Sequence, residues 1–398
     1  MTDGRPSEWR SWVEHACDEV AGAGRWRAPR PFDARGHEGS LADPLSAERP
    51  RTVVSFASND YLGLSTHPDV VAGARTALER WGAGSGASRL VTGSRPVHHA
   101  LEESLADWKG TESAVVFPTG FAANLSVLSV FASGGVVVHS DELNHASILD
   151  GCRLARADVR IYPHRDLSRL DAALADTPGR AIVVSDTVFS MDGDACDLEG
   201  LVEVAGRHGA LLVLDEAHAV LGPEPGDVHG TDVLRIGTLS KTLGSLGGFV
   251  AGPQRFVELL VNRGRPYIFT TAPSPADAGA ALAALGVLRS GEGDELRARL
   301  ARLIGRVAAT TGMTGHGSPI LPVVIGGEVE TVAASASLLD RGLWVPAIRP
   351  PTVAPGTSRL RITLSATHSD EQVDQLLAGL DGLLRPGTGV TRGVHSAA

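Results

Sequence analysis

The sequence predicts an α/β fold with a mostly parallel sheet, an N-terminal arm and a smaller C-terminal α+β domain. Two observations predict it. Short apolar runs recur between about residues 53 and 275, and several segments between them carry apolar residues at helical spacing. Strands that alternate with helices usually pair in parallel, and helices then cover both faces of the sheet. This part of the chain is therefore expected to form the major domain.

The expected elements of the major domain follow from these two patterns. Its strands are the apolar runs Ser113–Phe117, Val136–His139, Ala181–Ser185, Leu211–Leu214 and Phe249–Ala251. One helix is marked by Val70, Ala74, Ala77 and Trp81, after the start signals Thr66 and Pro68. A second helix is marked by Leu101, Leu105 and Trp108.

The chain divides into four expected parts: 1–52, 53–275, 276–386 and 387–398. The first begins with a helix and continues as a Pro/Gly/Arg-rich arm, and the last is expected to be a disordered tail. A Pro-rich stretch near residues 270–279 marks the boundary before the C-terminal domain. That domain should contain a helix to about Ala308, strands and a final helix: Val323–Ile325, Leu343–Val345, Leu360–Thr363 and Asp370–Leu384.

Composition excludes several classes of protein. The net charge of −10 argues against a nucleic-acid or anionic-membrane surface, and no apolar run reaches the ~18 residues of a membrane span. The N-terminus has acidic residues and no apolar segment of a signal peptide. Three cysteines without CxxC spacing make a disulfide framework or a zinc site unexpected. A cytoplasmic protein is the expectation.

A carboxylate and a histidine follow the apolar run Leu211–Leu214. Asp215 stands at the carboxyl end of this expected strand, and His218 comes three residues later. Ligands of open α/β sheets bind at that edge. If no ligand binds there, Asp215 is a helix cap or a solvated side chain, and His218 is an ordinary loop histidine. A metal site that adds Glu216 and His229 has no recognised ligand spacing, so no metal is expected.

A lysine lies in a loop of small and hydroxylated residues, 26 positions after Asp215. The segment runs from Arg235 to Gly248 and places Lys241 close to Thr238 and Ser240. Such a lysine is either a solvated surface residue or an amine that forms an imine with a carbonyl group. Small neighbours let a ligand approach the backbone, and the hydroxyls suit a phosphate. Together with a strand-end aspartate, the lysine indicates a pyridoxal-phosphate site.

Three further strand ends carry polar groups. Gly120 and Phe121 open a helix after one strand, where free amides suit a phosphate. His145 follows a second strand and is placed to stack on a flat ring, and Ser190 follows a third. Each has an ordinary structural interpretation alone, but together they favour one shared ligand.

The glycine-rich segment Trp81–Gly93 imitates a dinucleotide-binding fingerprint. Glycines and an alanine stand at the required spacing, and Glu102 lies about 20 residues further on. A helical stripe precedes the segment, however, and the fingerprint requires a strand there. No GxSxG elbow or phosphate-binding GxxxxGK[ST] loop occurs either, which disfavours serine hydrolases and nucleoside triphosphatases.

The sequence resembles the α-oxoamine synthases, which are fold-type I pyridoxal-phosphate enzymes. The matching segments run from about residue 55 to 370: SNDYLGLSTHPDV, GAGSGASRLVTGSRPVHHALEESLADW, DELNHASILDG, VFSMDGD, LDEAHAVLG, GTLSKTLGSLGG and IRPPTVAPGTSRLRITLSATH. Their order and combination are specific for the family, and less so for its acyl substrate. The resemblance implies a seven-stranded sheet and a homodimer with a shared active site.

The resemblance also implies residue roles. Lys241 matches the lysine that holds the cofactor as a Schiff base, Asp215 the partner of the pyridine nitrogen, and His218 a residue that hydrogen-bonds the ring oxygen. His145 matches the stacking residue. The remaining matches are cofactor contacts at Gly120, Phe121, Ser190 and Thr238, and substrate contacts at Asn59, His145, Arg349, Thr352 and Arg361. Arginine suits a substrate carboxylate because its donors are bidentate. Arg27 is a weaker match for the acyl substrate.

The activity that the resemblance implies is a decarboxylative condensation. The biotin-biosynthetic branch of the family joins L-alanine to a pimeloyl thioester, carried on coenzyme A or an acyl-carrier protein. The rivals within the family, glycine C-acetyltransferase and 5-aminolevulinate synthase, use glycine with another acyl-CoA. A catalytically silent binding or scaffold protein with this fold is the alternative from another class. Two departures stand out: the segment between His218 and Lys241 is short, and Asp186 replaces a glutamate of some relatives.

Overall fold

The computed structural model describes residues 8–44, 49–226, 228, 230–313 and 315–383. The chain forms two units, Met1–Val53 and Val54–Ala398. The expected tail, 387–398, lies outside the described residues. The finer division near residue 275 stays a prediction.

The first unit holds one helix and one hairpin. Helix α1 spans Glu8–Gly22 and buries none of its described residues. Strand β1 (Phe32–Ala34) pairs antiparallel with β2 (Glu38–Leu41), with Phe32 opposite Leu41. The Pro/Gly/Arg-rich stretch that follows the helix thus contains a hairpin.

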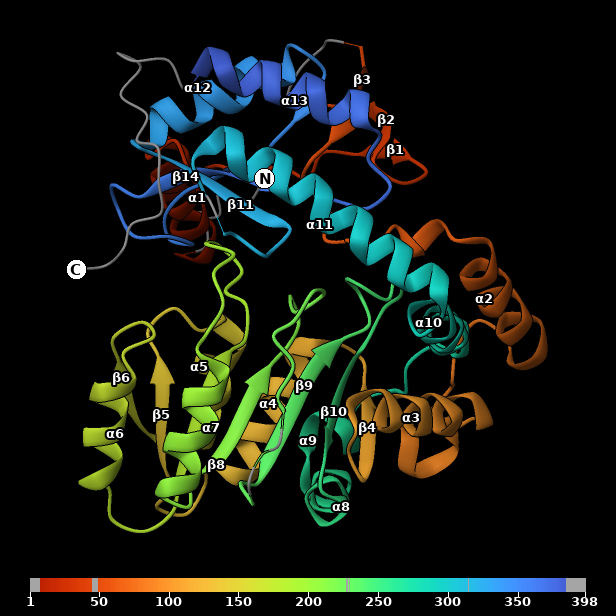
Figure 1. Ribbon diagram of the computed structural model, residues 1–398, viewed down its shortest axis with the longest axis vertical. Coiled ribbons are helices and arrows are strands. Elements are labelled where there is room, and N and C mark those ends of the chain that lie inside the picture. The colour runs from red at the N-terminus through yellow and green to blue at the C-terminus, as the bar shows by residue number, and fades with distance from the viewer. Residues whose placement is uncertain (1–7, 45–48, 227, 229, 314, 384–398) are drawn as a thin grey trace, which may run out of the picture. The chain divides into compact units, whose positions relative to one another are not determined.

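Seven strands of the second unit form the central sheet, in the order β4-β10-β9-β8-β7-β5-β6. Strands β5 to β9 run parallel to one another, whereas β10 is antiparallel to both of its neighbours, β4 and β9. The mostly parallel seven-stranded sheet is therefore confirmed (Figure 1). Its strands are β4 (Ser113–Phe117), β5 (Val137–Asp141), β6 (Asp158–Tyr162), β7 (Ala181–Asp186), β8 (Leu211–Asp215), β9 (Val233–Thr238) and β10 (Gly248–Gly252).

Alternate residues of this sheet enter two different apolar cores. In β8, Val213 packs in one core, and Leu212 and Leu214 pack in the other. Side chains alternate along a strand, so both faces need a cover of helices. One face is covered by α4 (Gly120–Phe131), α5 (Ala146–Ala155), α8 (Gln254–Arg263) and α9 (Arg265–Ile268), and the other by α6 (Leu167–Ala175) and α7 (Leu198–Arg207).

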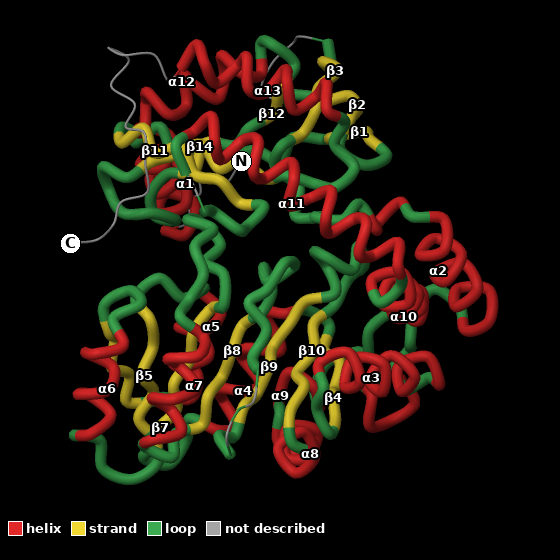
Figure 2. Tube along the Cα trace, viewed as in Figure 1, coloured by secondary structure: helices red, strands yellow, loops and turns green. Residues whose placement is uncertain are grey.

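The C-terminal part contains a three-stranded antiparallel sheet in the order β11-β14-β13. A short strand, β12, pairs in parallel with β3 through Leu343 and Val54. The strands are β3 (Arg51–Ser55), β11 (Ile320–Gly326), β12 (Leu343–Trp344), β13 (Ala347–Ile348) and β14 (Ser358–Thr363). The helices around them are α11 (Gly291–Thr311), α12 (Glu328–Leu339) and α13 (Asp370–Leu383) (Figure 2).

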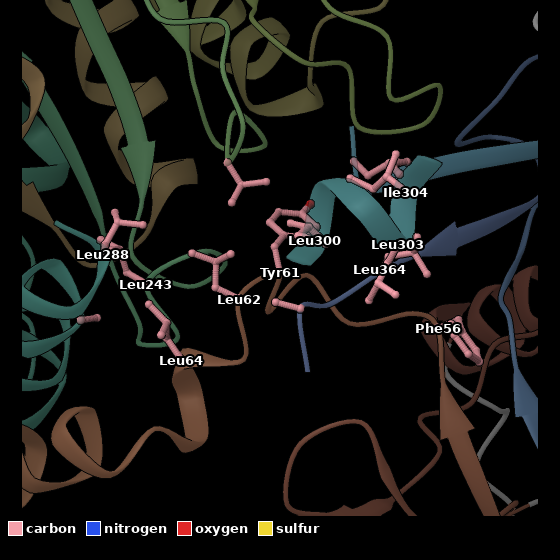
Figure 3. Packing of buried hydrophobic residues seen from close by; sticks show 14 of the residues in the cluster. Phe56, Tyr61, Leu62, Leu64, Leu243, Leu288, Leu300, Leu303, Ile304 and Leu364 are labelled. Carbon is pink, nitrogen blue, oxygen red and sulfur yellow. The ribbon is translucent and has the colours of Figure 1, made fainter. Parts of the chain in front are cut away.

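One apolar core joins this part to the rim of the central sheet. It includes Leu64 and Leu243 beside the lysine loop, and Leu300 and Leu303 of α11 (Figure 3). The remaining helices are η1 (Leu64–Thr66), α2 (Pro68–Trp81), η2 (Arg89–Gly93), α3 (Pro96–Lys109) and α10 (Pro275–Leu288). Helices α2 and α3 confirm the two apolar stripes. The shared core places the loops near Asn59 and Lys241 on a common scaffold.

One expectation about elements needs correction, and two strands of the central sheet were not named from the sequence. The single helix to about Ala308 is wrong, because α10 and α11 are separated at Ser290, whose backbone is extended. Strand β6 carries charged residues at the sheet edge and has no apolar run. Strand β9 is continuous, but Arg235 interrupts its apolar run; this arginine is nevertheless buried because Glu216 and Glu224 pair with it.

Candidate functional site

Lys241 and His218 are in direct contact beyond the carboxyl ends of β9 and β8. The lysine Nζ lies 2.6 Å from His218 Nε2, and His218 Nδ1 lies 2.5 Å from the hydroxyl of Tyr61. Burial lowers the pKa of Lys241 to about 8, although Asp215 and Asp186 raise it. Burial, with the charges of Lys241 and Arg361, also holds the pKa of His218 well below its usual range. The site therefore holds an amine of lowered pKa beside an imidazole whose pKa is also lowered.

The chain of contacts continues from Tyr61 to a buried arginine. The Tyr61 hydroxyl donates to Asn59 Oδ1 at 3.2 Å, and the same oxygen accepts from Arg361 at 3.2 and 3.3 Å. Arg361 Nε donates to the carbonyl of Ser190 at 2.6 Å. Three predicted residues, Asn59, Ser190 and Arg361, are thus brought together with His218 and Lys241.

Asp215 is fixed by two donors. Its Oδ2 accepts from Asn124 Nδ2 at 2.7 Å, and its Oδ1 accepts from the backbone amide of Ala217 at 3.0 Å. The Asn124 amide also donates to Ser147 Oγ, which lies 2.8 Å from His145 Nδ1. Burial lowers the pKa of His145 despite the nearby Asp215 charge. The structure thus links the strand-end carboxylate to the predicted stacking histidine.

Asp186 ends the strand beside Asp215. The two residues are partners in the parallel register of β7 and β8. Asp186 is buried, and burial followed by the Asp215 charge raises its pKa well above the usual range. The two carboxyl groups at this sheet edge therefore differ in their surroundings: Asp215 accepts two hydrogen bonds, whereas Asp186 Oδ1 has no partner among the described residues.

The start of α4 lies against the end of β9. Thr119 caps the helix by accepting a hydrogen bond from the amide of Ala122. Gly120 and Phe121 form the first turn of this helix. A Cβ on Gly120 would lie 3.4 Å from Thr238 Cβ. Thr238 Oγ1 is in turn 2.7 Å from Ser240 Oγ. Backbone amides and two hydroxyls therefore gather close to Lys241, a donor set that suits a phosphate.

Two substrate-site predictions lie in one turn after β13. The amide of Thr352 donates to the carbonyl of Arg349 at 3.1 Å. Strand β13 pairs with β14, which carries Arg361. The roles of Arg349 and Thr352 stay predictions. Arg27 belongs to the first unit, and its role stays a prediction.

Three residues of the contact network were not predicted as site residues: Tyr61, Asn124 and Ser147. Asn124 lies one turn after Gly120 on α4, so the helical period places both on one side of the helix. Tyr61 lies two residues after Asn59 in the segment that carries the family resemblance. These two spacings are the sequence features that point to Asn124 and Tyr61 as site residues.

Two alternatives find no support in the geometry. Glu216 contacts Lys109 Nζ at 2.8 Å and Arg235 Nε at 2.5 Å, so its carboxylate serves a buried ion cluster. His229, the other residue of the metal alternative, lies outside the described residues. The glycine-rich loop at Gly82 follows α2, and a dinucleotide fingerprint would need a strand there.

The residues that meet here fit pyridoxal phosphate. They provide an amine of lowered pKa, a buried carboxylate, a neighbouring imidazole and an anion-binding helix start. Two buried oxygens, Asn124 Oδ1 and Asp186 Oδ1, have no hydrogen-bond partner among the described residues. Buried polar atoms are normally paired, so these two are free to face a polar ligand.

Comparison with known proteins agrees with this geometry. Residues 51–380 match the model of the family "Aminotransferase class I and II". The 8-amino-7-oxononanoate synthase of Paraburkholderia xenovorans is 47% identical over 352 residues, which is 84% of this chain and 89% of the relative. The same-named protein of Anaeromyxobacter sp. is also 47% identical, over 89% and 93% of the two chains.

Among solved structures, serine palmitoyltransferase (SPT) with its PLP internal aldimine superimposes with a TM-score of 0.85 at 30% sequence identity. The match covers 95% of this chain and 98% of the solved one. The fold-type I architecture expected from the sequence is thereby confirmed. The chain belongs to the class I and II aminotransferase family and, within it, to the α-oxoamine synthases.

Proposed function

We propose that this enzyme condenses L-alanine with a pimeloyl thioester and releases carbon dioxide, which yields 8-amino-7-oxononanoate for biotin synthesis. The observation that carries the proposal is the contact chain from Lys241 through His218, Tyr61 and Asn59 to Arg361. It joins an amine suited to imine chemistry to a buried guanidinium suited to a carboxylate. An amino acid offers both complementary groups.

The enzyme depends on pyridoxal 5'-phosphate, which when bound acts as the electron sink for the carbon next to the substrate amine. In the proposal, Lys241 holds the cofactor covalently and later carries the proton of that carbon. Its lowered pKa supports this role, because about a tenth of the amine is neutral at pH 7. Asp215 keeps a proton on the pyridine nitrogen, and its two donors hold the carboxylate in one orientation.

The other predicted residues complete the proposed site. His145 stacks on the ring, and His218 hydrogen-bonds the ring oxygen. The amides of Gly120 and Phe121 bind the phosphate together with Thr238, and Ser190 borders the same ligand. Arg361 takes the carboxylate of the amino acid, while Asn59, Arg349 and Thr352 border the substrate. Arg27 is proposed as a further contact of the acyl substrate.

The acyl substrate is proposed from similarity and from available space. A cavity of about 530 Å³ borders His218. Its lining includes the apolar residues Val188, Leu221, Met313 and Pro319, and the polar residues Arg165, Asp194, His316 and Ser318. Coenzyme A and acyl-carrier protein are both compatible carriers of the thioester. Glycine remains the rival amino acid, because one methyl group changes binding by only about 1–3 kcal/mol.

Two broader statements complete the proposal. The protein is proposed to work in the cytoplasm; among the described residues no helix is long and apolar enough to cross a membrane. It is also proposed to be a homodimer. Leu90 and Val91 of η2 and Phe269, which follows α9, are exposed, and Arg89 of η2 stacks over Tyr267 of α9. This apolar patch is suited to a second copy of the chain.

The test is a product assay with a panel of substrates. The holoenzyme is incubated with L-alanine, glycine or L-serine, each with pimeloyl, acetyl, succinyl and palmitoyl thioesters, and products are identified by mass. Alanine with a pimeloyl thioester should turn over at least tenfold faster than every other pair, and Lys241→Ala should abolish turnover. Faster reaction of glycine with acetyl-CoA or succinyl-CoA would replace the proposed substrates.

A further inference from the structure

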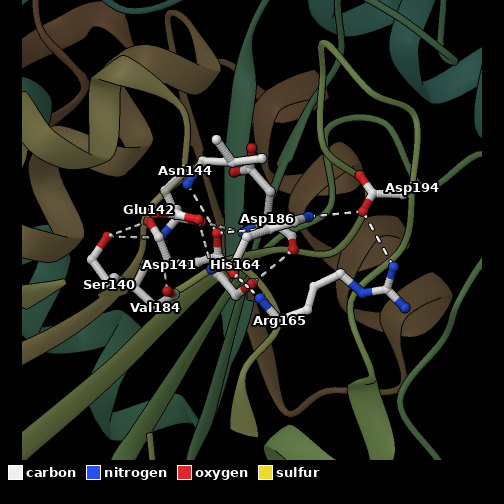
Figure 4. A network of polar contacts seen from close by, with 11 residues as sticks. Ser140, Asp141, Glu142, Asn144, His164, Arg165, Val184, Asp186 and Asp194 are labelled. Carbon is white, nitrogen blue, oxygen red and sulfur yellow. Dashed lines mark hydrogen bonds and ion pairs between the residues drawn. The ribbon is translucent and has the colours of Figure 1, made fainter. Parts of the chain in front are cut away.

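His164 lies between two carboxylates that come from different strand-end segments (Figure 4). Its Nδ1 is 2.9 Å from Asp141 Oδ1, and its Nε2 is 2.8 Å from Asp194 Oδ2. The imidazole also meets the ring of Phe189 edge-on, with centroids 4.3 Å apart. His164 precedes Lys241 by 77 residues in the chain and is not one of the proposed substrate contacts.

The two contacts determine the charge of this imidazole. A carboxylate only accepts hydrogen bonds, so both ring nitrogens must donate, and only the protonated form of histidine has two N–H groups. Burial alone would lower the pKa of His164, but its bonds to Asp141 and Asp194 raise it to about 9. His164 is therefore an imidazolium held between two anions at neutral pH.

Asp141 connects this cation to the turn that carries His145. Besides His164, its side chain accepts from the backbone amide of Leu143 at 2.9 Å. The next residue, Asn144, donates to the carbonyl of Val184 at 2.8 Å and accepts from the amide of Asp186 at 2.9 Å. His145 follows directly and begins α5. The position of the stacking histidine thus depends on a turn that Asp141 and Asn144 fasten to the sheet.

Asp194 connects the same cation to the turn that carries Ser190. This turn is closed by backbone bonds from Phe189 to Asp194 at 2.9 Å and from Gly193 to Phe189 at 2.8 Å. On its other side, Arg361 binds the carbonyl of Ser190, and Arg359 pairs with Asp192. Asp194 is the only residue of the turn that the described ion pairs join to the Asp141 side.

We infer that His164 is a positioning residue that clamps the His145 turn and the Ser190 turn at a set separation around the cofactor. The two turns follow β5 and β7, which pair in parallel, and the ionic bridge through His164 links the turns beyond the end of that ladder. The inference rests on the proposed cofactor site and adds a residue outside it. Without the cation, Asp141 and Asp194 would repel each other across the gap.

Other charged or titratable groups face this clamp. Arg165 donates its own amide to Asp141 at 2.9 Å and approaches Asp194 at 3.3 Å, but its side chain is about half exposed. Glu142 accepts from the amide of His164. Tyr162, Cys196 and His316 also lie within electrostatic range of Asp141 or Asp194. Arg165 cannot replace His164, because its guanidinium contacts only one of the two carboxylates in the ion pairs described.

The first test measures the protonation of His164 itself. Histidines labelled in the ring are titrated by NMR in the full-length enzyme, and His164→Gln identifies the resonance. The expected result is a ring protonated on both nitrogens at pH 7.5, with a midpoint near pH 9. A neutral His164 at pH 7.5 would overturn the inference, whatever the substrate of the enzyme is.

The second test compares variants of the clamp with a matched control. His208 contacts Asp171 at 2.9 Å, and the adjacent Arg207 pairs with the same carboxylate, so this pair copies the His164–Arg165–Asp194 arrangement away from the site turns. His164→Gln should reduce kcat at least tenfold and the visible circular dichroism of the bound cofactor at least twofold. His208→Gln should leave both within twofold of the parent enzyme.

A double variant separates a clamp from general destabilisation. Asp194→Asn should reproduce the loss of His164→Gln, and the double variant should lose no more than either single variant, because both remove one bridge. Losses that multiply in the double variant would overturn the inference, as would parental dichroism and kcat in folded His164→Gln. If the variants show the expected loss of dichroism but the parent enzyme does not condense alanine with a pimeloyl thioester, the proposed function alone would be rejected.

Discussion

The two carboxyl groups at the ends of β7 and β8 have different surroundings. Asp215 receives donors from Asn124 and Ala217, whereas the pKa of Asp186 is raised by burial and by the Asp215 charge. The raised pKa favours the neutral form of Asp186. This arrangement predicts that only one of them is sensitive to loss of its charge.

Asp215→Asn is expected to reduce kcat/KM at least 100-fold, because an amide cannot stabilise a protonated pyridine nitrogen. Each unit of pKa lost by that nitrogen corresponds to about 1.4 kcal/mol. Asp186→Asn should cost less than tenfold, since the amide resembles the neutral acid in shape and charge. Steady-state kinetics on both cofactor-loaded variants make the comparison, and equal losses would contradict the assigned roles.

Lys241 should set the pH dependence of cofactor loading. Its pKa is lowered from 10.5 to about 8, so the neutral amine that attacks an aldehyde increases as the pH rises through 8. The rate of pyridoxal-phosphate uptake by apoenzyme should therefore rise about tenfold between pH 6.5 and 7.5 and level off above pH 9. Stopped-flow absorbance measures it. A rate that is flat from pH 6.5 to 9, or that rises only near pH 10.5, would refute a buried amine.

At the scale of elements, the approach of β10 to the start of α4 depends on a glycine. A Cβ on Gly248 would lie 2.5 Å from the carbonyl carbon of Thr119, which is backbone and cannot move alone. Gly248→Ala should therefore displace the first turn of α4 and weaken cofactor binding at least tenfold. Fluorescence titration of apoenzyme with the cofactor measures this.

Gly286→Ala provides the matched control for this substitution. Gly286 lies within α10, and a Cβ there would meet no atom within 4 Å. Alanine favours helices over glycine by about 1 kcal/mol, so this variant should bind the cofactor normally and unfold at the same or a higher temperature. Equal cofactor affinities for both variants would show that the Gly248 contact does not support the site.

Sequence patterns predicted the elements whose local signals agree with their environment. The run Leu211–Leu214 is wholly apolar and lies at the centre of the sheet, so its strand was predictable. Strand β9 was missed because the cost of burying Arg235 is offset by Glu216, 19 residues away in the chain. Such compensation by tertiary contacts leaves no periodic signal.

The same distinction applies to the site. Lys241 and Asp215 were predictable because each stands at the end of a recognisable strand or in a marked loop. Tyr61 was missed because its partner, His218, lies 157 residues later in the chain. Asn124 was missed since an amide in an apolar helix is usually a packing residue. Contacts between distant segments require the three-dimensional arrangement.

For the whole molecule, we expect a homodimer in solution. Val91 and Phe269 are 74% and 70% exposed, and such apolar residues in adjoining elements are usually covered by a partner. Light scattering of the enzyme should give twice the chain mass of 41.4 kDa. Val91→Glu with Phe269→Glu should shift the mass towards the monomer and reduce activity. An active monomer of the parent enzyme would rule out a shared site.

The covalent attachment of pyridoxal phosphate to Lys241 is tested most directly by borohydride reduction. The purified holoenzyme should be yellow, and reduction should bleach the visible band and leave one phosphopyridoxyl group. Peptide mass spectrometry should locate that group on Lys241, whose Nζ contacts His218 in the structure. Lys241→Ala should carry no label. A reconstituted enzyme that stays colourless, or a label on another lysine, would contradict the account.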